Sequence, residues 1–422
     1  MTTQAARLEP RAPARERPAS LTDLIAWAAA IVALLIYSQA WLVPVFGETI
    51  EAADSSLVRT LYVPAYAIGL ALLALKPAAS LRGLGGQPFL VVLLGIAAAS
   101  VLWSVSPDQT LRRSIAVTLT TVGGVAIGAR WRWSGLTETV GATFAVLLVG
   151  SLIAGVFFPA VGRMATTFPG SWRGLWLEKN TFGGEMAFAL LIFAAAGVLK
   201  PQRRVLWFAL AVAAFGLTIA STSKTSLVAL MLGLAVFALA LVVRRGRSMA
   251  VIAIYAAVVG LLGLGAGILF APDVFLDLLG KDATLTGRTK IWAAVLRQIQ
   301  ERPWLGYGYG AVWSEDTGWG PLAWIVKQAG FRPEHSHNSW LEQWLGMGYW
   351  GLGAWSLYYL TTLVRGIGAM FRSDGALVAL PFIAVYTVMT LTESVAVSYN
   401  DLRWVIFVAF SIRLALRDEA AG

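Results

Sequence analysis

The sequence predicts an all-α integral membrane protein with about twelve transmembrane helices and one long, partly helical loop on the outer side. Hydrophobic residues make up 58% of the 422 residues and charged residues only 13%, which is about half the charged share of a soluble domain. Apolar runs of membrane-spanning length recur along the chain, because backbone groups in lipid must pair within a helix. Cysteine is absent, which excludes a disulfide framework and a thiolate metal site.

The amino-terminal residues precede the first predicted span. Residues 1–20 are rich in Ala, Pro and Arg, a composition typical of a disordered tail, which we place in the cytoplasm. The apolar run 24–46 is long for the apolar region of a signal peptide and lacks a small-residue cleavage site. It is therefore predicted to remain as the first span.

Twelve apolar runs are candidates to cross the bilayer. They cover residues 24–46, 60–76, 88–104, 111–129, 138–158, 181–199, 205–221, 225–243, 249–271, 340–364, 375–396 and 402–416. Run 60–76 is the weakest of them, because Pro64 interrupts it. The predicted division is thus nine spans within 21–271, a loop over 272–338 that holds the candidate active site, and three spans with a short cytoplasmic tail over 339–422.

The charges between the spans predict the orientation. Seven connections that alternate along the chain are all basic: Arg7/Arg11/Arg15/Arg17, Lys76/Arg82, Arg130/Arg132, Lys200/Arg203/Arg204, Arg244/Arg245/Arg247, Arg365/Arg372 and Arg413/Arg417. By the positive-inside rule these connections, and both termini, lie in the cytoplasm. The net charge of +10 therefore reflects topology, and no nucleic-acid partner is expected.

A few basic residues fall on the predicted outer side, against this bias. Arg163, Arg173 and Lys179 lie in the connection 159–180, and Lys224 lies in a turn of small hydroxyl residues. An anionic ligand at the outer face explains such exceptions, and a diphosphate suits Lys224 in particular. The alternative is that these residues anchor the spans at the interface or balance Glu178.

The long loop contains a predicted helix over Lys290–Arg302, with apolar residues on one face. We expect this helix to lie along the outer leaflet with Trp292 and Trp304 at headgroup level. Arg288 precedes it, where a helix N-terminus favours an anion; a membrane-anchoring role for this arginine remains open. Pro303 ends the helix, and a flexible glycine-rich turn follows over 306–310.

The only two histidines, His335 and His337, lie at the end of this loop. Imidazole is the usual acid–base group near neutral pH, so His337 is the candidate catalytic residue, with His335 and Glu342 in support. The simpler alternative is an interfacial histidine beside a helix N-cap formed by Asn338 or Ser339. Two histidines with a neighbouring glutamate are a weak metal signal, and we expect neither a metal nor a cofactor. Whether Glu342 or Glu393 assists stays open.

Several stretches together resemble the O-antigen ligase and Wzy-type polymerase superfamily of bacterial envelope glycan enzymes. The most specific is His337-Asn338, followed after nine residues by Gly348-Tyr349-Trp350-Gly351. Gly287-Arg288-Thr289 and the stretch from Glu301 to Gly308 resemble the family's loop signature. Weaker landmarks are Trp103-Ser104 with Pro107-Asp108, and Lys179-Asn180 with Gly183.

The resemblance implies a metal-independent, inverting glycosyl transfer at the periplasmic face of the bacterial inner membrane. The donor would be a glycan on undecaprenyl diphosphate, and the acceptor a sugar hydroxyl that His337 deprotonates. Arg288, Lys224 and Arg163 or Arg173 would hold the diphosphate. Many relatives carry arginine where this chain has Lys224, and this form looks more like exopolysaccharide polymerases. Membrane lipid and export or chain-length proteins are the other expected partners.

Two alternatives remain. One is an O-antigen ligase, which transfers finished polymer to a lipid A core. The other, from a different class, is a flippase or transporter of lipid-linked oligosaccharide. A transporter is expected to carry charged residues within its spans and to repeat its halves. Here the chemistry gathers in one asymmetric loop, and no Walker motif is present, which favours the enzyme.

Overall fold

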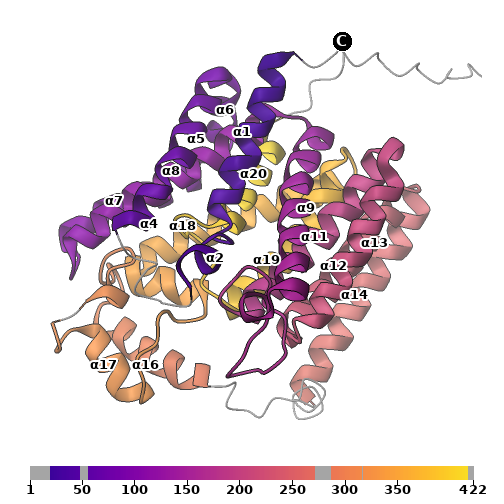
Figure 1. Cartoon of the computed structure of the whole chain (residues 1–422). Helices are drawn as coiled ribbons and strands as arrows, with labels where there is room; N and C mark the ends of the chain where they lie inside the picture. Colours follow the sequence, from indigo (N-terminus) through magenta and orange to yellow (C-terminus); the bar gives the residue numbers. More distant parts are fainter. Residues whose placement is uncertain (1–19, 48–55, 271–286, 316, 417–422) are drawn as a thin grey trace, which may run out of the picture.

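The computed structural model describes residues 20–47, 56–270, 287–315 and 317–416, and it is helical almost throughout these ranges (Figure 1). In the described ranges, extended pairing is confined to one isolated bridge between Arg163 and Trp172. The predicted tail 1–20, apart from Ser20, and residues 48–55 after the first predicted span lie outside the described residues. Ser20 is the N-cap of the first helix and accepts a hydrogen bond from the Asp23 amide.

The first part of the chain forms the helices that lead to the long connection 159–178. They are α1 (Leu21–Tyr37), α2 (Leu42–Phe46), α4 (Ser56–Leu61), α5 (Val63–Leu75), α6 (Pro77–Gly85), α7 (Pro88–Ala99), the 3-10 turn η1 (Ser100–Trp103), α8 (Pro107–Arg130), α9 (Trp133–Phe157) and α10 (Pro159–Gly162).

The second part completes the bundle and forms the loop helices. Its elements are α11 (Lys179–Leu199), η2 (Pro201–Arg203), α12 (Arg204–Ala220), α13 (Lys224–Val243), α14 (Arg247–Phe270), α16 (Arg288–Glu301), η4 (Val312–Ser314), α17 (Pro321–Ala329), α18 (Ser339–Ala369), α19 (Gly375–Thr392) and α20 (Leu402–Ala415).

Each of the twelve predicted spans lies on a helix or on neighbouring helices, but the predicted number of crossings is not confirmed. Among the described residues, six helices are long and apolar enough to cross a membrane, or seven if the bent pair α6–α7 is one span. Run 24–46 is divided, because α1 ends at Tyr37 and Gln39 adopts a positive φ of 60°. Pro64 does not interrupt its run, because it lies in the first turn of α5, where proline is tolerated.

Helices that fail the length and hydropathy test are nevertheless central in the bundle. In α8, Gly124 and Gly128 face α20 so closely that a Cβ on Gly128 would lie 2.2 Å from the Ala409 carbonyl oxygen. Next to this contact, the fully buried aromatic residues Trp355, Trp404 and Phe407 pack together. Helices buried in protein do not need an apolar surface for lipid, which explains the low hydropathy of α8. Helix α20 fails the test because it has only 14 residues.

The helices of the long loop lie at one end of the bundle, while α6 and the last residues of α20 lie at the other (Figure 1). The predicted loop helix is confirmed as α16, but it does not lie on a leaflet by itself. Its apolar face packs against α17 and α18 around Ile291, Val295 and Ile299. Helix α17 was not predicted; it provides the protein surface that covers this face.

Candidate active site

The motif stretches that are separated in the sequence contact one another through their backbones. The amides of Tyr307 and Gly308 donate to the carbonyls of Leu345 and Gly346 in α18, at 2.9 and 2.8 Å. The Val105 amide then donates to the Tyr307 carbonyl at 2.9 Å. The glycine-rich turn predicted to be flexible is therefore held between α18 and the residues before α8.

Helix α18 is interrupted at the predicted glycine motif. Gly348 has φ +62°, and a Cβ there would lie 2.1 Å from the carbonyl oxygen of Trp304. The next residue, Tyr349, donates its amide to the carbonyl of Pro303 at 2.9 Å. Since only glycine combines this φ with so close a backbone approach, the motif anchors the residues that follow α16 and so fixes the position of that helix.

His337 lies between α16 and α18 in a constrained backbone conformation. Its φ is +53°, which is unusual for a residue with a side chain. Asn338 is the N-cap of α18, as predicted, and accepts hydrogen bonds from the amides of Trp340 and Leu341. From α16, Trp292 donates its indole N–H to the Ser336 carbonyl at 2.9 Å. These contacts hold the histidine segment against both helices.

The side chain of His337 is linked to Arg288 through Glu393, a residue just after α19. Nδ1 of His337 lies 3.0 Å from one carboxylate oxygen of Glu393, and the guanidinium of Arg288 lies 2.6 Å from the other. The Arg288 and Glu393 side chains are only 14% and 15% exposed. We refer to Arg288, Glu393 and His337 as the triplet.

The electrostatics of the triplet keep its carboxylate charged. Burial raises the pKa of Glu393, but the hydrogen bond to His337 and the charge of Arg288 outweigh it, and the net pKa lies below the ordinary value. An ionised carboxylate accepts hydrogen bonds, so Nδ1 of His337 is the donor in this contact. Within the described residues, Nε2 makes no hydrogen bond.

Glu393 is itself held by α18. The Ser339 hydroxyl donates to the Glu393 carbonyl at 2.8 Å and accepts the amides of Val395 and Ala396. Ser339 is fully buried. The sequence did not predict a specific role for Glu393, because 56 positions separate it from His337 and no local pattern joins them. Its place at the end of an otherwise apolar run was the one available signal.

Glu342 contacts the loop backbone rather than the His337 ring. One of its oxygens accepts the Ser336 amide at 2.6 Å and the Ser394 hydroxyl at 3.2 Å, and the other accepts the indole N–H of Trp313 at 2.8 Å. Glu342 thus ties together the two segments that contain His337 and Glu393.

His335 packs against His337, with ring centroids 4.0 Å apart. The His337 amide donates to Nδ1 of His335 at 3.1 Å. Burial, together with repulsion from His337, lowers the pKa of His335 to about 4, so this ring is neutral at physiological pH. His335 therefore supports the backbone of His337 through the hydrogen bond to its amide, and it adds no positive charge to the site.

The triplet also raises the question of a metal. Ligand atoms of His335, His337 and Glu393 lie within 4.8 Å of one another. However, both oxygens of Glu393 already contact other groups, and one of these groups is the Arg288 cation at 2.6 Å. A divalent ion would face this guanidinium directly, so the donor set fits a proton-transfer site better than a metal site.

Two of the predicted basic residues lie at helix N-termini near the triplet. Lys179 begins α11 and Lys224 begins α13, and the two lysines repel one another. The two helix starts are joined by a hydrogen bond of 2.9 Å between the side chains of Ser223 and Asn180. Glu178, before α11, interacts electrostatically with Glu393, His337 and Arg288.

Arg163 and Arg173 are placed differently. Arg173 is 3% exposed, and its guanidinium donates to the carbonyls of Val161 and Ala160, both at 2.8 Å. Arg163 donates to the Gly155 carbonyl at 2.9 Å, and its guanidinium lies over the Trp172 ring. Both arginines therefore stabilise the turn around α10.

A cavity of about 640 Å³ opens beside His335. The residues that line it include the aromatic side chains of Tyr62, Tyr66 and Trp313 and the cationic side chains of Arg59 and Arg112. Aromatic faces and multiple hydrogen-bonding groups suit a polar ligand with apolar ring faces. The fold and site thus define a polytopic helical membrane protein with a histidine–carboxylate pair at one end of the bundle.

Comparison with known proteins agrees with this class. Residues 209–356 match the family described as O-antigen ligase, a range that includes Arg288 and His337 but not Glu393. The exopolysaccharide production protein ExoQ of Rhizobium meliloti is 28% identical over 294 residues, and the O-antigen ligase of Pseudomonas aeruginosa is 28% identical over 277 residues. These alignments cover 66% and 64% of this chain and 65% of each relative, so the chain matches less than two thirds of either relative's length. Residues 209–356 are thus similar to the O-antigen ligase family, and the described residues include helices long and apolar enough to cross a membrane.

Proposed function

We propose that the protein is an inner-membrane glycosyltransferase that moves a glycan from an undecaprenyl-diphosphate carrier to a sugar hydroxyl, most simply to polymerise exopolysaccharide repeat units. The observation that carries the proposal is the contact of His337 Nδ1 with Glu393 at 3.0 Å. It leaves Nε2 as the proton acceptor, which is the arrangement that a general base requires.

The proposed reaction has one covalent exchange. Nε2 of His337 takes the proton of the acceptor hydroxyl as its oxygen attacks the anomeric carbon of the donor. The bond from this carbon to the diphosphate oxygen breaks, and the lipid diphosphate leaves with the bonding electrons. Attack from the face opposite the leaving group inverts the anomeric centre. Glu393 stabilises the imidazolium that forms, and the proton later passes to solvent.

Three cationic groups are proposed to contact the leaving diphosphate. Arg288 lies in the triplet, paired with Glu393, and Lys179 and Lys224 lie at two helix N-termini that a Ser223–Asn180 hydrogen bond joins. Helix N-termini and basic side chains stabilise phosphate without a metal ion. In this proposal the 640 Å³ cavity beside His335 receives the acceptor sugar, with its tyrosines and Trp313 against the sugar ring.

The polymerase assignment is supported by the match to ExoQ, a protein named for exopolysaccharide production. It also agrees with the resemblance of the lysine form at Lys224 to exopolysaccharide polymerases. An O-antigen ligase is the second candidate, because the Pseudomonas aeruginosa relative bears that name at the same 28% identity. The proposed topology places both termini in the cytoplasm and the triplet in the periplasm, and export or chain-length proteins are proposed partners.

Reconstitution with purified lipid-linked repeat units tests the proposal. Wild type, His337→Ala and Arg288→Ala are compared in liposomes with EDTA throughout, and Glu301→Gln, an exposed change at the end of α16, is the matched control. The expected result is glycan extension by wild type and control, and a loss of at least about 10²-fold in His337→Ala. Donor consumption that requires an added lipid A core indicates the ligase. Full activity of His337→Ala contradicts the site, and glycolipid translocation without new glycosidic bonds indicates the transporter.

A further inference from the structure

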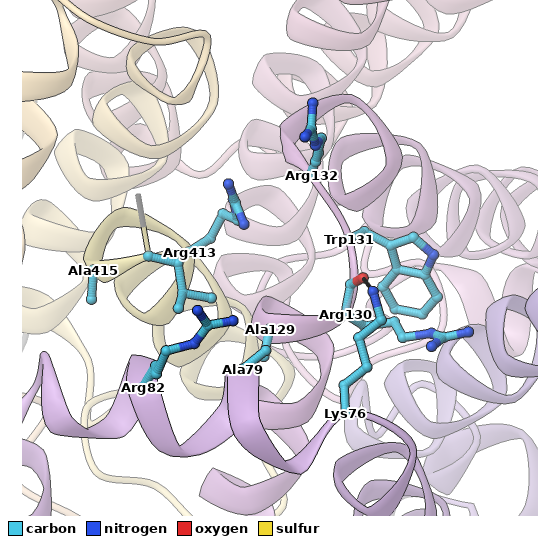
Figure 2. A pocket seen from close by; sticks show the side chains of 10 residues that line it. Lys76, Ala79, Arg82, Ala129, Arg130, Trp131, Arg132, Arg413 and Ala415 are labelled. Atoms are coloured by element: carbon cyan, nitrogen blue, oxygen red, sulfur yellow. Dashed lines mark hydrogen bonds between the residues drawn. The ribbon is translucent and has the colours of Figure 1, made fainter. Parts of the chain in front are cut away.

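Helix α8 has a cavity at each end. The cavity at its C-terminal end has a volume of about 530 Å³, and Lys76 there is directed at the Arg130 carbonyl (Figure 2). Arg130 also pairs with Asp23 at 2.6 Å. The cavity at the N-terminal end of α8 is the one of about 640 Å³ beside His335. This second cavity adjoins the triplet, because the rings of His335 and His337 lie 4.0 Å apart.

The charged residues of the cavity beside His335 come from two different parts of the chain. Arg59 and Arg112 belong to α4 and to the first turns of α8. Glu334 and Glu342 belong to the segment before α18 and to the first turn of that helix, and Glu342 already accepts three hydrogen bonds from the protein. The cavity therefore has a cationic part formed by Arg59 and Arg112, which we call the arginine wall, and its acidic residues lie on the histidine side.

The arginine wall has no acidic partner among the described residues. Arg59 is exposed and makes no hydrogen bond or ion pair with them, and Arg112 donates its Nε to the Asp108 carbonyl at 3.1 Å. The terminal N–H groups of both guanidiniums are therefore open to a ligand, whereas the neighbouring Arg113 contacts the Gly310 carbonyl. In the proposed topology, Arg59 and Arg112 lie at the outer ends of their helices, where the positive-inside rule does not account for basic residues.

Gln343 gives this cavity a hydrogen-bond acceptor that lacks a donor. Its Nε2 donates to the Ala396 carbonyl at 3.1 Å, which fixes the orientation of the amide, because only the NH₂ group donates. Its Oε1 has no hydrogen-bond partner in the described part of the chain, although Gln343 is only 3% exposed. A buried acceptor without a donor is destabilising, and a hydroxyl of a bound sugar supplies the missing donor.

We propose that this cavity selects an acidic acceptor glycan, whose negative group binds Arg59 and Arg112 while one of its hydroxyls donates to Gln343. A carboxylate or a phosphate presents two oxygens to the planar N–H groups of a guanidinium, which a neutral sugar does not do. The inference rests on the proposed function and deepens it, because it states the charge of the acceptor that His337 deprotonates. A carboxylate on a sugar ring and a phosphate at the reducing end are two sources of the same chemistry, and the test separates them.

The test is equilibrium dialysis of the full-length protein in nanodiscs against oligosaccharides prepared from its lipid-linked repeat unit. The three probes are the oligosaccharide 1-phosphate, the free oligosaccharide, and the free oligosaccharide with every carboxyl group reduced to an alcohol. Wild type is expected to bind an anionic probe more tightly than the reduced one. A preference for the 1-phosphate over the free oligosaccharide identifies the phosphate as the source, and a preference for the free over the reduced oligosaccharide identifies the carboxylate.

Variants assign this preference to the arginine wall. Arg59→Gln/Arg112→Gln removes both of its cations, and Arg297→Gln changes an exposed arginine of α16 outside the cavity and is the matched control. The double variant is expected to bind the preferred anionic probe about 25-fold more weakly, from about fivefold for each exposed ion pair, and to bind the reduced probe as wild type does. Gln343→Leu is expected to weaken all three probes by about fivefold, because the acceptor that it removes is uncharged.

Thermal melting checks that each variant folds. If the double variant does not, Arg59→Gln alone is used, with an expected weakening of about fivefold. Equal binding of all three probes by wild type overturns the proposal, and so does the absence of binding or an anionic preference that the folded variant keeps. Charge-dependent binding by a protein that transfers no glycan in the reconstitution assay overturns the proposed function alone. Glycan transfer in that assay, together with charge-independent binding, overturns this inference alone.

Discussion

Replacing Glu393 by glutamine is the sharpest test of how the site works. The carboxylate now accepts from two donors, Arg288 at 2.6 Å and His337 at 3.0 Å. A glutamine has the same shape but only one acceptor oxygen, and its NH₂ group must face one of these donors. The backbone carbonyl of residue 393, which accepts from Ser339, is unaffected, so the fold around α19 is retained.

The expected loss follows from the unmet hydrogen bond. Leaving a buried donor without its acceptor costs about 1–3 kcal/mol, and somewhat more when the group is charged. Since about 1.4 kcal/mol corresponds to a tenfold change in rate, we expect kcat of Glu393→Gln to fall about 30- to 100-fold. KM for the lipid-linked donor is expected to change less, because Lys179 and Lys224 are untouched.

The assay is the initial rate of polymer formation in liposomes, with melting temperature measured in parallel and Glu301→Gln as the charge-matched control. Glu393→Asp is expected to recover part of the lost kcat, because it restores the carboxylate with a shorter reach. In an Arg288→Gln background, the Glu393→Gln change is expected to cost less than it does alone, because the two residues act as a unit. A kcat within twofold of wild type, in a protein of unchanged melting temperature, would refute the positioning role of Glu393.

Three further predictions concern single residues. Burial lowers the pKa of His335 to about 4, so the imidazole of His335 binds a proton more readily in the unfolded chain than in the folded one. The free energy of unfolding is therefore expected to fall by about 2–3 kcal/mol as the pH is lowered from 6.5 to 4. In chemical denaturation at a series of pH values, His335→Gln is expected to remove most of this pH dependence. Arg173→Gln is expected to lower the free energy of unfolding by about 2–3 kcal/mol, because two backbone carbonyls lose their hydrogen-bond donor. Lys224→Gln is expected to raise KM for the donor and to leave the melting temperature unchanged. If Arg173→Gln instead raises KM and Lys224→Gln lowers stability, Arg173 is the residue that holds the diphosphate. Gly348→Ala is expected to reduce the yield of folded protein strongly, because the new Cβ would lie 2.1 Å from a carbonyl oxygen. A Cβ on Gly353 would meet no atom within 4 Å, so Gly353→Ala is expected to leave the yield unchanged. Size-exclusion chromatography measures the folded yield of both variants.

The positions of the helices could be predicted from the sequence, because the length of an apolar run is a local property of the chain. Each of the twelve predicted runs lies on a helix or on neighbouring helices, and Asn338, one of the two expected N-caps, caps α18. The number of crossings did not follow, because hydropathy measures only how a helix suits lipid. Helix α8 is polar by this measure yet is largely enclosed by protein, and Arg403 in α20 is stabilised by Glu185 and Asp401.

The candidate site was predictable only where its residues are close in sequence. His335, His337 and Asn338 form one recognisable group, and Arg288 precedes a visible helix pattern. Glu393 and the contacts between the glycine motif and the residues after α16 depend on how the chain returns to the same end of the bundle. Such contacts are tertiary, and no local spacing specifies them.

The arrangement of helix ends offers a physical reason why the proposed transfer does not need a metal. Four helices, α11, α13, α16 and α18, begin at residues that are linked to the site: Lys179, Lys224, Arg288 and, after His337 and its cap, Ser339. Each helix N-terminus carries about half a positive charge that acts within the first turn. Three of these starts also carry a cationic side chain. In the proposed reaction, the departing diphosphate therefore meets preorganised dipoles and fixed cations in place of Mg²⁺. In the same proposal the carboxylate of Glu393 has a distinct purpose, because it accepts from Nδ1 of His337 and so directs Nε2 to the hydroxyl proton.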